Sequence, residues 1–261
     1  MKIFDTHAHY DDERYSEDLE YVIKDNYENG VLRIVNASYD LPSSIKSKEL
    51  AEKYDIIYFA VGIHPDSVGK NIDEDIIALE KIIKENIDNK KMVAIGEIGL
   101  DYYYTKENIG IQKEYFIRQM ELAIKYDLPV IIHCRDAGYD MYSILKDKKY
   151  LGLNIVFHCF QPTDEITHLI IKRNYMIGLG GNITYKRNKH SIELIKLIPL
   201  NQIMVETDAP YMSPACVRGT RNESKNIKYV IEKIAEIKSV EQEVLQEILY
   251  DNSVNFFKIK K

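Results

Sequence analysis

Histidine and carboxylate side chains recur in this chain at spacings that suit the binding of divalent metal ions. His7 and His9 follow a short apolar segment, and side chains two residues apart on a strand point the same way, so both imidazoles can reach one ion. An H-x-H pair alone is a weak signal. Its weight comes from the other histidines and carboxylates that follow apolar segments further along: His64, Glu97, His133, His158 and Asp208.

Imidazole and carboxylate ligands together suit Zn²⁺ and related divalent ions, and such sites keep positions open for water or substrate. Two ions need a bridging ligand, and a carboxylate has two oxygens for that purpose, which makes Glu97 the best candidate. Water held by the ions would have its pKa lowered toward about 7, so that hydroxide is available at neutral pH. Asp208 could be a ligand, a general base, or both. The expected cofactor is a pair of divalent ions, with Zn²⁺, Mg²⁺ and Mn²⁺ all open.

The elements that must position these residues follow a regular alternation. Short apolar, β-branched segments are separated by longer segments of helical periodicity, and this order predicts parallel strands joined by helical crossovers. In residues 226–238, for example, the apolar positions have the spacing of a helix packed on one side. The expected strands are Lys2–Asp5, Leu32–Asn36, Ile56–Val61, Met92–Ile95, Pro129–Ile132, Asn154–Phe157, Met176–Leu179 and Ile203–Val205.

About eight such units favour a closed (β/α)₈ TIM barrel, so we expect one α/β domain over residues 1–261. An open doubly wound sheet is the alternative, but no G-x-G-x-x-G follows the first strand and no Walker A sequence is present. A barrel carries its chemistry at the C-terminal ends of the strands, and five of the seven histidines fall there. The histidines and carboxylates are therefore expected to form one site.

Composition excludes several classes of protein. Apolar residues are 45% and charged residues 29%, as in an ordinary globular protein with a sizeable core. No run of about 18 apolar residues exists, so we expect no membrane span. The N-terminal segment lacks the apolar stretch of a signal peptide, and the three cysteines are too few for a disulfide framework; both favour a cytoplasmic location. A net charge of −6 argues against coating nucleic acid by bulk charge, but leaves a local basic patch open.

Taken in order, the motifs resemble those of one known family. D-T-H-A-H, G-I-H-P, G-E-I-G-L-D, H-C-R-D-A, H-C-F and E-T-D-A-P-Y, with the later P-A-C-V-R-G, resemble the TatD family of metal-dependent deoxyribonucleases. The resemblance covers nearly the whole chain and implies an amidohydrolase-like (β/α)₈ barrel that hydrolyses DNA phosphodiester bonds with divalent metals. Where the family often has Ser-Gly after H-C-F, this chain has Gln161 and Pro162. That departure bears on the loop after the sixth strand, not on the ligands.

The resemblance also implies a division of the ligands between two ions that share one carboxylate. The implied ligands are His7, His9, Glu97 and Asp208 for one ion, and Glu97, His133 and His158 for the other. His64 would assist near the scissile group. The expected catalytic residues are thus Asp208, Glu97 and His64, and no ligand of the family pattern is missing.

Two cysteines and two further carboxylates adjoin the expected ligands. Cys134 and Cys159 each follow a ligand histidine, but strand alternation points them outward, so we expect small apolar fillers rather than zinc thiolates. Asp5 and Glu206 each lie two residues before a ligand and should face the barrel interior. There we expect them to orient a ligand histidine or an interior arginine.

Basic and aromatic residues are expected on the same rim of the barrel. Asp101 and the run Tyr102–Tyr104 follow Glu97, either as an aromatic surface on which bases stack or as a loop packed on its own side chains. The basic residues of the rim are Arg135, Lys186, Arg187, Lys189, Arg218 and Arg221. In an acidic protein this bias suggests a phosphate-bearing substrate, and the alternative is a solvated charged rim. Arg135 is favoured because it lies two residues after His133.

Three functions are compatible with these residues. The leading hypothesis is a two-metal phosphodiesterase that acts on DNA, from an end or on single strands, with Arg135, Arg218 and Arg221 holding the phosphate backbone. The nearest competitor keeps the metals but hydrolyses another ester, an amide or an aminoacyl linkage, because one fold hosts many reactions. The third is a metal-binding protein without catalysis. No protein partner is inferable.

Overall fold

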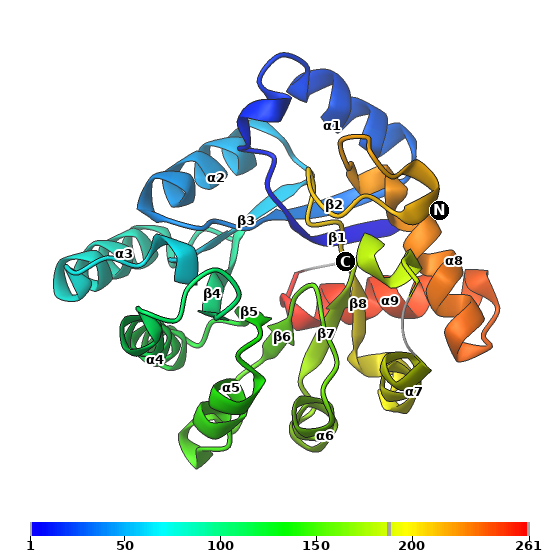
Figure 1. Cartoon of the computed structure of the whole chain (residues 1–261). Helices are drawn as coiled ribbons and strands as arrows, with labels where there is room; N and C mark the ends of the chain where they lie inside the picture. The colour runs from blue at the N-terminus through cyan, green and yellow to red at the C-terminus, as the bar shows by residue number, and fades with distance from the viewer. Residues whose placement is uncertain (1, 187–188, 260–261) are drawn as a thin grey trace.

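A parallel sheet that follows chain order forms the centre of the molecule. The computed structural model describes residues 2–186 and 189–259, and its eight strands are hydrogen-bonded in the order β1 to β8. The strands are β1 (Ile3–Ala8), β2 (Val31–Asn36), β3 (Ile57–Val61), β4 (Met92–Asp101), β5 (Val130–Arg135), β6 (Ile155–Phe157), β7 (Met176–Leu179) and β8 (Ile203–Val205). Helices surround the strands (Figure 1), and this arrangement confirms the predicted (β/α)₈ barrel.

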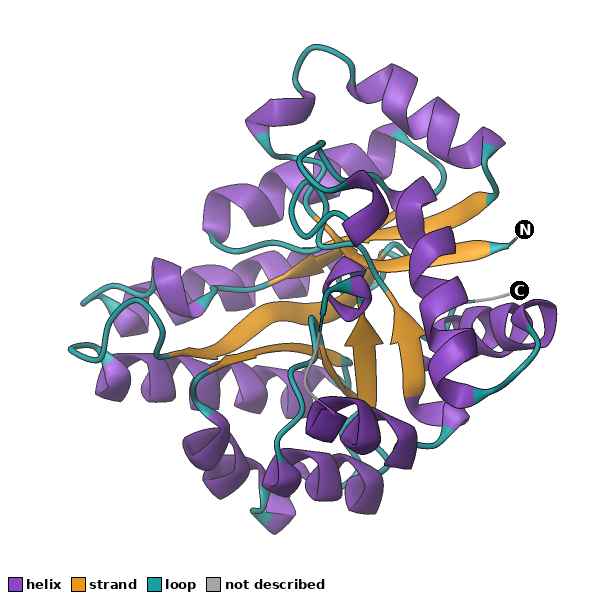
Figure 2. Ribbon diagram, turned by 45° about the vertical axis from the view of Figure 1, so that its right-hand side comes forward, coloured by secondary structure: helices purple, strands orange, loops and turns teal. Residues whose placement is uncertain are grey.

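The helices that connect the strands lie on the outside of the sheet, as Figure 2 shows with helices in purple and strands in orange. The α-helices are α1 (Leu19–Glu28), α2 (Leu41–Lys53), α3 (Ile72–Asn86), α4 (Ile109–Tyr126), α5 (Gly138–Leu145), α6 (Asp164–Arg173), α7 (Lys189–Leu197), α8 (Ile227–Lys238) and α9 (Gln242–Phe256). Local sequence sets their starts. The Asp40 carboxylate accepts the Ser43 amide at the beginning of α2, and Thr163 caps α6 in the same way. Among the described residues, no helix combines the length and the apolar character that crossing a bilayer requires.

The barrel closes where its first strand meets the segment after its last. Ala8 and Ala209 form a parallel bridge. The His9 amide donates to the Ala209 carbonyl at 2.7 Å, and the Asp208 amide donates to the His7 carbonyl at 2.9 Å. Closure therefore brings residues some two hundred positions apart side by side at the C-terminal ends of the strands.

The opposite end of the barrel is filled by apolar side chains. One cluster draws a residue from every strand, such as Phe4, Val35 and Ile131, and packs them against Val254 and Phe257 in and after α9. A larger cluster lies between the strands and the outer helices. Figure 1 shows α9, in red, across the middle of the ring of helices. One end of the barrel is thus sealed, and polar chemistry is confined to the other.

Three strands extend further than the sequence pattern predicts. β1 continues through His7, β4 through Glu97 to Asp101, and β5 through His133 to Arg135. In β4 the two glycines resemble a strand end in sequence, but Gly99 pairs with His133. A Cβ on Gly99 would lie 1.9 Å from the His133 carbonyl oxygen, and its φ is +152°. Glycine is therefore required for this close approach, and it does not end the strand.

Candidate metal centre

The histidines and carboxylates singled out from the sequence converge at one cavity at the C-terminal ends of the strands. The cavity has a volume of about 430 Å³. Its lining includes His9, His64, Glu97, Asp101, Tyr104, His133, Arg135, His158, Asp208 and Tyr211. His7 is fully buried beside it. Because β1, β4 and β5 carry some of these residues directly and the segments after β3, β6 and β8 carry the rest, barrel closure alone assembles the group.

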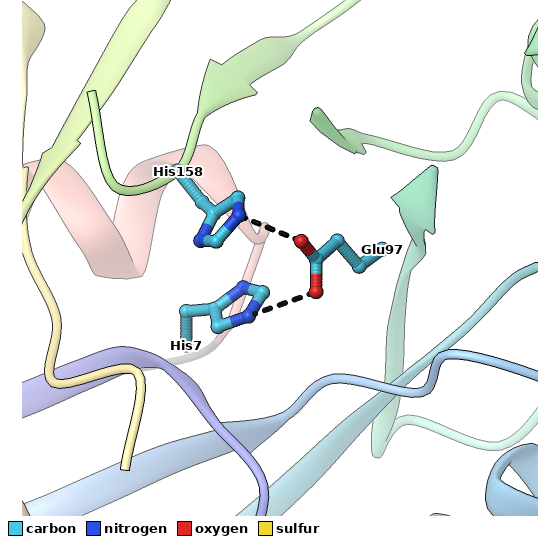
Figure 3. Close-up of side chains that lie close together, drawn as sticks. All are labelled: His7, Glu97 and His158. Carbon is cyan, nitrogen blue, oxygen red and sulfur yellow. Dashed lines mark ion pairs between the residues drawn. The ribbon is translucent and has the colours of Figure 1, made fainter. Parts of the chain in front are cut away.

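Glu97 lies at the centre of the cluster and turns its two carboxylate oxygens in different directions. Oε2 is 3.3 Å from His7 Nε2, and Oε1 is 2.7 Å from His158 Nε2 (Figure 3). Oε1 is also 2.8 Å from His133 Nδ1 and 3.4 Å from His64 Nε2. One carboxylate therefore faces two separate sets of imidazole nitrogens.

Asp208 completes the first of these sets. Its Oδ1 is 3.3 Å from His9 Nε2 and 3.7 Å from His7 Nε2, and the two imidazole nitrogens are 3.1 Å apart. The described residues contain three overlapping groups whose ligand atoms lie within 4.8 Å of one another. They are His7, His9 and Asp208; His7, Glu97 and His158; and His64, Glu97 and His133.

Hydrogen bonds to the outer nitrogens decide which imidazole nitrogens are free. His9 Nδ1 donates to the Ala37 carbonyl at 2.9 Å, because a carbonyl can only accept, so in the neutral ring Nε2 is the nitrogen that can bind an ion. His133 Nε2 faces the Asp101 carboxylate at 2.8 Å, which leaves Nδ1 as the lone pair. His9 Nε2 faces His7 Nε2 and an Asp208 oxygen, and His133 Nδ1 faces His158 Nε2 and a Glu97 oxygen. A cation would stabilise this arrangement. The donor set therefore fits divalent metal ions.

The charges of the cluster depend on one another. Burial acts to raise the pKa of Glu97, but His158, His64 and His7 outweigh it and hold that pKa well below its usual range. Burial likewise opposes the charged form of His9, yet Asp208 and Glu97 raise its pKa to about 9. Burial also acts to raise the pKa of Asp208, but the hydrogen bond with His9 and the charge of His158 lower it. Both carboxylates are thus ionised at neutral pH, as metal ligands must be.

The two interior carboxylates before the ligands have different environments. Glu206 Oε1 accepts the Cys159 amide and lies 3.7 Å from His158 Nδ1, which is beyond hydrogen-bond distance, so that its role in orienting this histidine stays a prediction. For Asp5 the expectation is wrong. Its carboxylate accepts the Thr207 amide at 3.0 Å and the Thr207 and Ser224 hydroxyls at 2.6 Å each. Burial raises the pKa of Asp5 to about 7, and the carboxyl ties β1 to the segment after β8 instead of orienting an imidazole.

Asp101 is a site residue whose role was not predicted from the sequence. Besides His133 Nε2, it accepts the Tyr103 amide at 2.8 Å, and Gln112 bonds both its amide and its carbonyl. Burial acts to raise the pKa of Asp101, but His133 and the Tyr103 amide lower it. Strand periodicity could have found it, because Asp101 lies four residues after Glu97 and an even spacing shares a face.

Of the three arginines expected to bind substrate, one reaches the cavity. Arg135 lines it, and no ion pair with a carboxylate is found for Arg135 within the described residues. Arg221 instead binds Asp18 through two nitrogens at 2.7 Å each and Glu223 at 3.1 Å, so its surroundings do not support a substrate role. Arg218 is exposed and lies 5.1 Å from the Tyr185 ring, outside the cavity lining.

The remaining basic and cysteine residues lie outside the cluster. Lys186 and Lys189 are exposed, and Arg187 falls outside the described residues. Cys134 packs against the apolar core, and burial raises the pKa of its thiol to about 12. No cysteine belongs to the ligand groups that the described residues form, as the strand alternation predicts.

Several known proteins resemble this chain in sequence and fold. A family model described as TatD related DNase matches residues 4–258. The uncharacterized metal-dependent hydrolase YabD of Bacillus subtilis is 40% identical over 257 residues, which cover 98% of this chain and 99% of YabD. The crystal structure of YjjV, a TatD homolog of Escherichia coli, is 29% identical with a TM-score of 0.90, covering 99% of this chain and 98% of YjjV. A TatD family hydrolase of Entamoeba histolytica is 26% identical with a TM-score of 0.83, and 98% of each chain is covered. This chain belongs to the TatD family of metal-dependent hydrolases.

Proposed function

We propose that this protein is a deoxyribonuclease that cleaves DNA phosphodiester bonds with two divalent metal ions. The observation that carries the proposal is that the two oxygens of Glu97 face different histidines, with Oε2 directed at His7 and Oε1 at His133 and His158. A carboxylate in this position can bridge two ions. Ligands of one ion would be His7, His9, Glu97 and Asp208, and ligands of the other Glu97, His133 and His158.

Bound there, divalent ions would supply Lewis acidity to a phosphoryl oxygen and make hydroxide available at neutral pH. Asp208 is suited to take up a proton because its side chain is 18% exposed to the cavity, whereas Glu97 is 5% exposed. His64 accepts the Asp66 amide at Nδ1, so its Nε2 carries a hydrogen directed into the cavity. This hydrogen can stabilise negative charge that develops on the substrate.

Two observations favour DNA among the possible substrates. The matching family model is described as a DNase. Arg135 also presents its guanidinium to the same cavity as the cluster, and within the described residues this group forms no direct ion pair with a carboxylate. A guanidinium pairs well with the paired oxygens of a phosphodiester. An amide or ester substrate that has no anionic group would not offer such oxygens.

The test is the release of nucleotides from end-labelled single- and double-stranded DNA, with matched RNA, by protein loaded with Mg²⁺, Mn²⁺ or Zn²⁺. We expect Glu97→Gln to lower the rate by more than the roughly 10- to 100-fold typical of groups around a metal's ligands. Metal analysis should show loss of bound ions in that variant. The matched control is Glu85→Gln on α3, whose side chain is 61% exposed and lies outside the cavity lining.

Two results would separate this function from its competitors. Turnover of amides or carboxylic esters without any nucleotide release would assign the same centre to another hydrolysis. Stoichiometric metal binding without turnover of any ester, amide or phosphodiester would leave a metal-binding protein.

A further inference from the structure

Two exposed tyrosines on the rim of the cavity are not used by the proposed chemistry. The side chains of Tyr103 and Tyr104 are 57% and 70% exposed. We propose that Tyr103, Tyr104 and the guanidinium of Arg135 form a platform on which one nucleobase of the substrate stacks. The proposal rests on the proposed function for its substrate class and adds a base-binding subsite to it.

The three groups form one surface. The Tyr103 and Tyr104 rings are nearly perpendicular, at 88° with centroids 4.9 Å apart. The Arg135 Cζ lies 3.7 Å from the centre of the Tyr103 ring and 5.0 Å from that of Tyr104. One face of Tyr103 is thus covered by the guanidinium, while Tyr104, which lines the cavity, is 70% exposed. Aromatic rings and guanidinium planes are the two side-chain surfaces on which bases stack.

The platform is held at a fixed place relative to the metal cluster. The Asp101 carboxylate accepts the Tyr103 amide at 2.8 Å through Oδ1 and faces His133 Nε2 at 2.8 Å through Oδ2. One buried carboxylate therefore links the aromatic residues to a ligand histidine. In a nucleotide, the base is likewise held at a short distance from the phosphate, because one sugar joins the two. A phosphate beside Arg135 and His133 would place its base at Tyr104.

The loop does not need these two rings for its own packing. The neighbouring Tyr102 is 9% exposed and donates its hydroxyl to Asp140 at 2.9 Å, so it anchors the segment to α5. Tyr103 and Tyr104 contact each other and Arg135 but remain outside the core, and this high exposure favours the base-stacking interpretation of these two tyrosines. Their exposed aromatic area is available to a ligand.

The opposite side of the cavity is less suited to a polyanion. Beyond Asp12 and Tyr39, which also line the metal cavity, lies a hollow of about 1310 Å³. Carboxylates outnumber ammonium groups on its wall, with Asp11, Asp12, Glu13, Glu17, Asp18, Glu20 and Glu49 against Lys24, Lys46 and Lys53. Charge therefore directs a phosphate-bearing strand toward the Arg135 side.

The test compares two ligands that differ only in the base. Isothermal titration of the metal-loaded protein with thymidine 5′-monophosphate and with 2-deoxyribose 5-phosphate measures what the base contributes. We expect the wild-type protein to bind the nucleotide about 5- to 100-fold more tightly. Tyr104→Leu should reduce this ratio to near one, and Tyr104→Phe should keep it. The matched control is Tyr139→Leu, at a tyrosine that is 83% exposed but does not line the cavity.

Three results would overturn the platform: no preference for the nucleotide in the wild-type protein, no measurable binding of the nucleotide at millimolar concentration, or a preference that Tyr104→Leu leaves unchanged. The binding assay does not depend on turnover. Failure of the platform is therefore distinguishable from failure of the proposed nuclease, which is judged by DNA hydrolysis alone.

Discussion

At the scale of single residues, the site depends on which nitrogen of each imidazole is left free to bind an ion. His9 Nδ1 is hydrogen-bonded to the Ala37 carbonyl, and His133 Nε2 is hydrogen-bonded to Asp101, so the two rings present different nitrogens to the cavity. The Asp101 contact is the more consequential because both partners are ionisable. A carboxylate behind a histidine fixes the tautomer and raises the basicity of the free nitrogen.

Replacing Asp101 with Asn keeps the shape of the side chain and removes its charge. We expect the Asp101→Asn substitution to lower the metal affinity about 10- to 100-fold, because His133 is then less firmly held with Nδ1 toward Glu97. Competition with a chelating dye measures the affinity directly, without reference to turnover. Asp88→Asn, at an exposed position after α3, is the control. Equal affinities in the two variants would show that Asp101 does not act through His133.

The residues of the site were predictable to the extent that they lie at strand ends. His7, His9 and Glu97 were found from type and spacing alone, and the barrel brings them together. The pairing of Arg221 with Asp18 could not be read in advance, because it joins segments 203 positions apart. The expectation for Asp5 was wrong for the same reason, because its partners Thr207 and Ser224 are brought next to it only when the barrel closes.

At the scale of elements, contacts between neighbouring helices hold the outer layer in place. Glu80 on α3 accepts Lys125 Nζ and the Tyr126 hydroxyl of α4, each at 2.6 Å, and Lys84 lies 3.3 Å away. These partners, led by Lys125, lower the pKa of Glu80 to about 2. The ionised carboxylate is thus the form that joins the two helices.

The pH dependence of this contact has a definite sign. The folded pKa of about 2 lies below the ordinary value of 4.5, so the stabilisation is complete above pH 4.5 and is lost as the pH falls toward 2. We expect Glu80→Gln to lower the Tm at pH 7 by roughly one to two degrees, because the side chain is partly exposed. Thermal melts at pH 7, 5, 4 and 3 should show this gap narrowing below pH 4.5. The Tm of Glu85→Gln should equal that of the wild-type protein at every pH. A difference in Tm between the wild-type protein and Glu80→Gln that is as large at pH 3 as at pH 7 would contradict the assignment.

Element order was the most predictable level of the structure, and element ends the least. Alternating strand and helix segments predicted all eight strands and their parallel order. The extension of β4 to Asp101 was not predicted, because glycine in a sequence indicates a turn and a close strand contact equally well. The position of α9 was not predictable either, because helical periodicity does not show which part of the barrel a helix covers, and α9 seals the interior.

At the scale of the whole molecule, the barrel is closed by apolar packing at one end and by polar groups at the other. The N-terminal end is filled from every strand and covered by α9. At the C-terminal end, buried and half-buried imidazoles and carboxylates from β1, β4 and β5 and from the segments after β6 and β8 meet around Glu97. Buried charge is costly unless it is compensated. Divalent ions there would join opposite sides of the barrel and compensate the carboxylates.

Metal binding should therefore raise the stability of the whole fold. Ions that bind only the folded state stabilise it by about 2.7 kcal/mol at a concentration one hundred times their Kd. For a domain of this size that corresponds to a rise in Tm of roughly 5 to 10 degrees. Differential scanning calorimetry with chelator, and then with added Mn²⁺ or Zn²⁺, measures the shift. Glu97→Gln should lose most of it because the ligand shared between the two ions is replaced, whereas Glu85→Gln should keep it. A Tm that is the same with chelator and with ions would mean that the cluster does not couple metal binding to folding, and that the charges of Glu97 and Asp208 are compensated by protonated histidines alone.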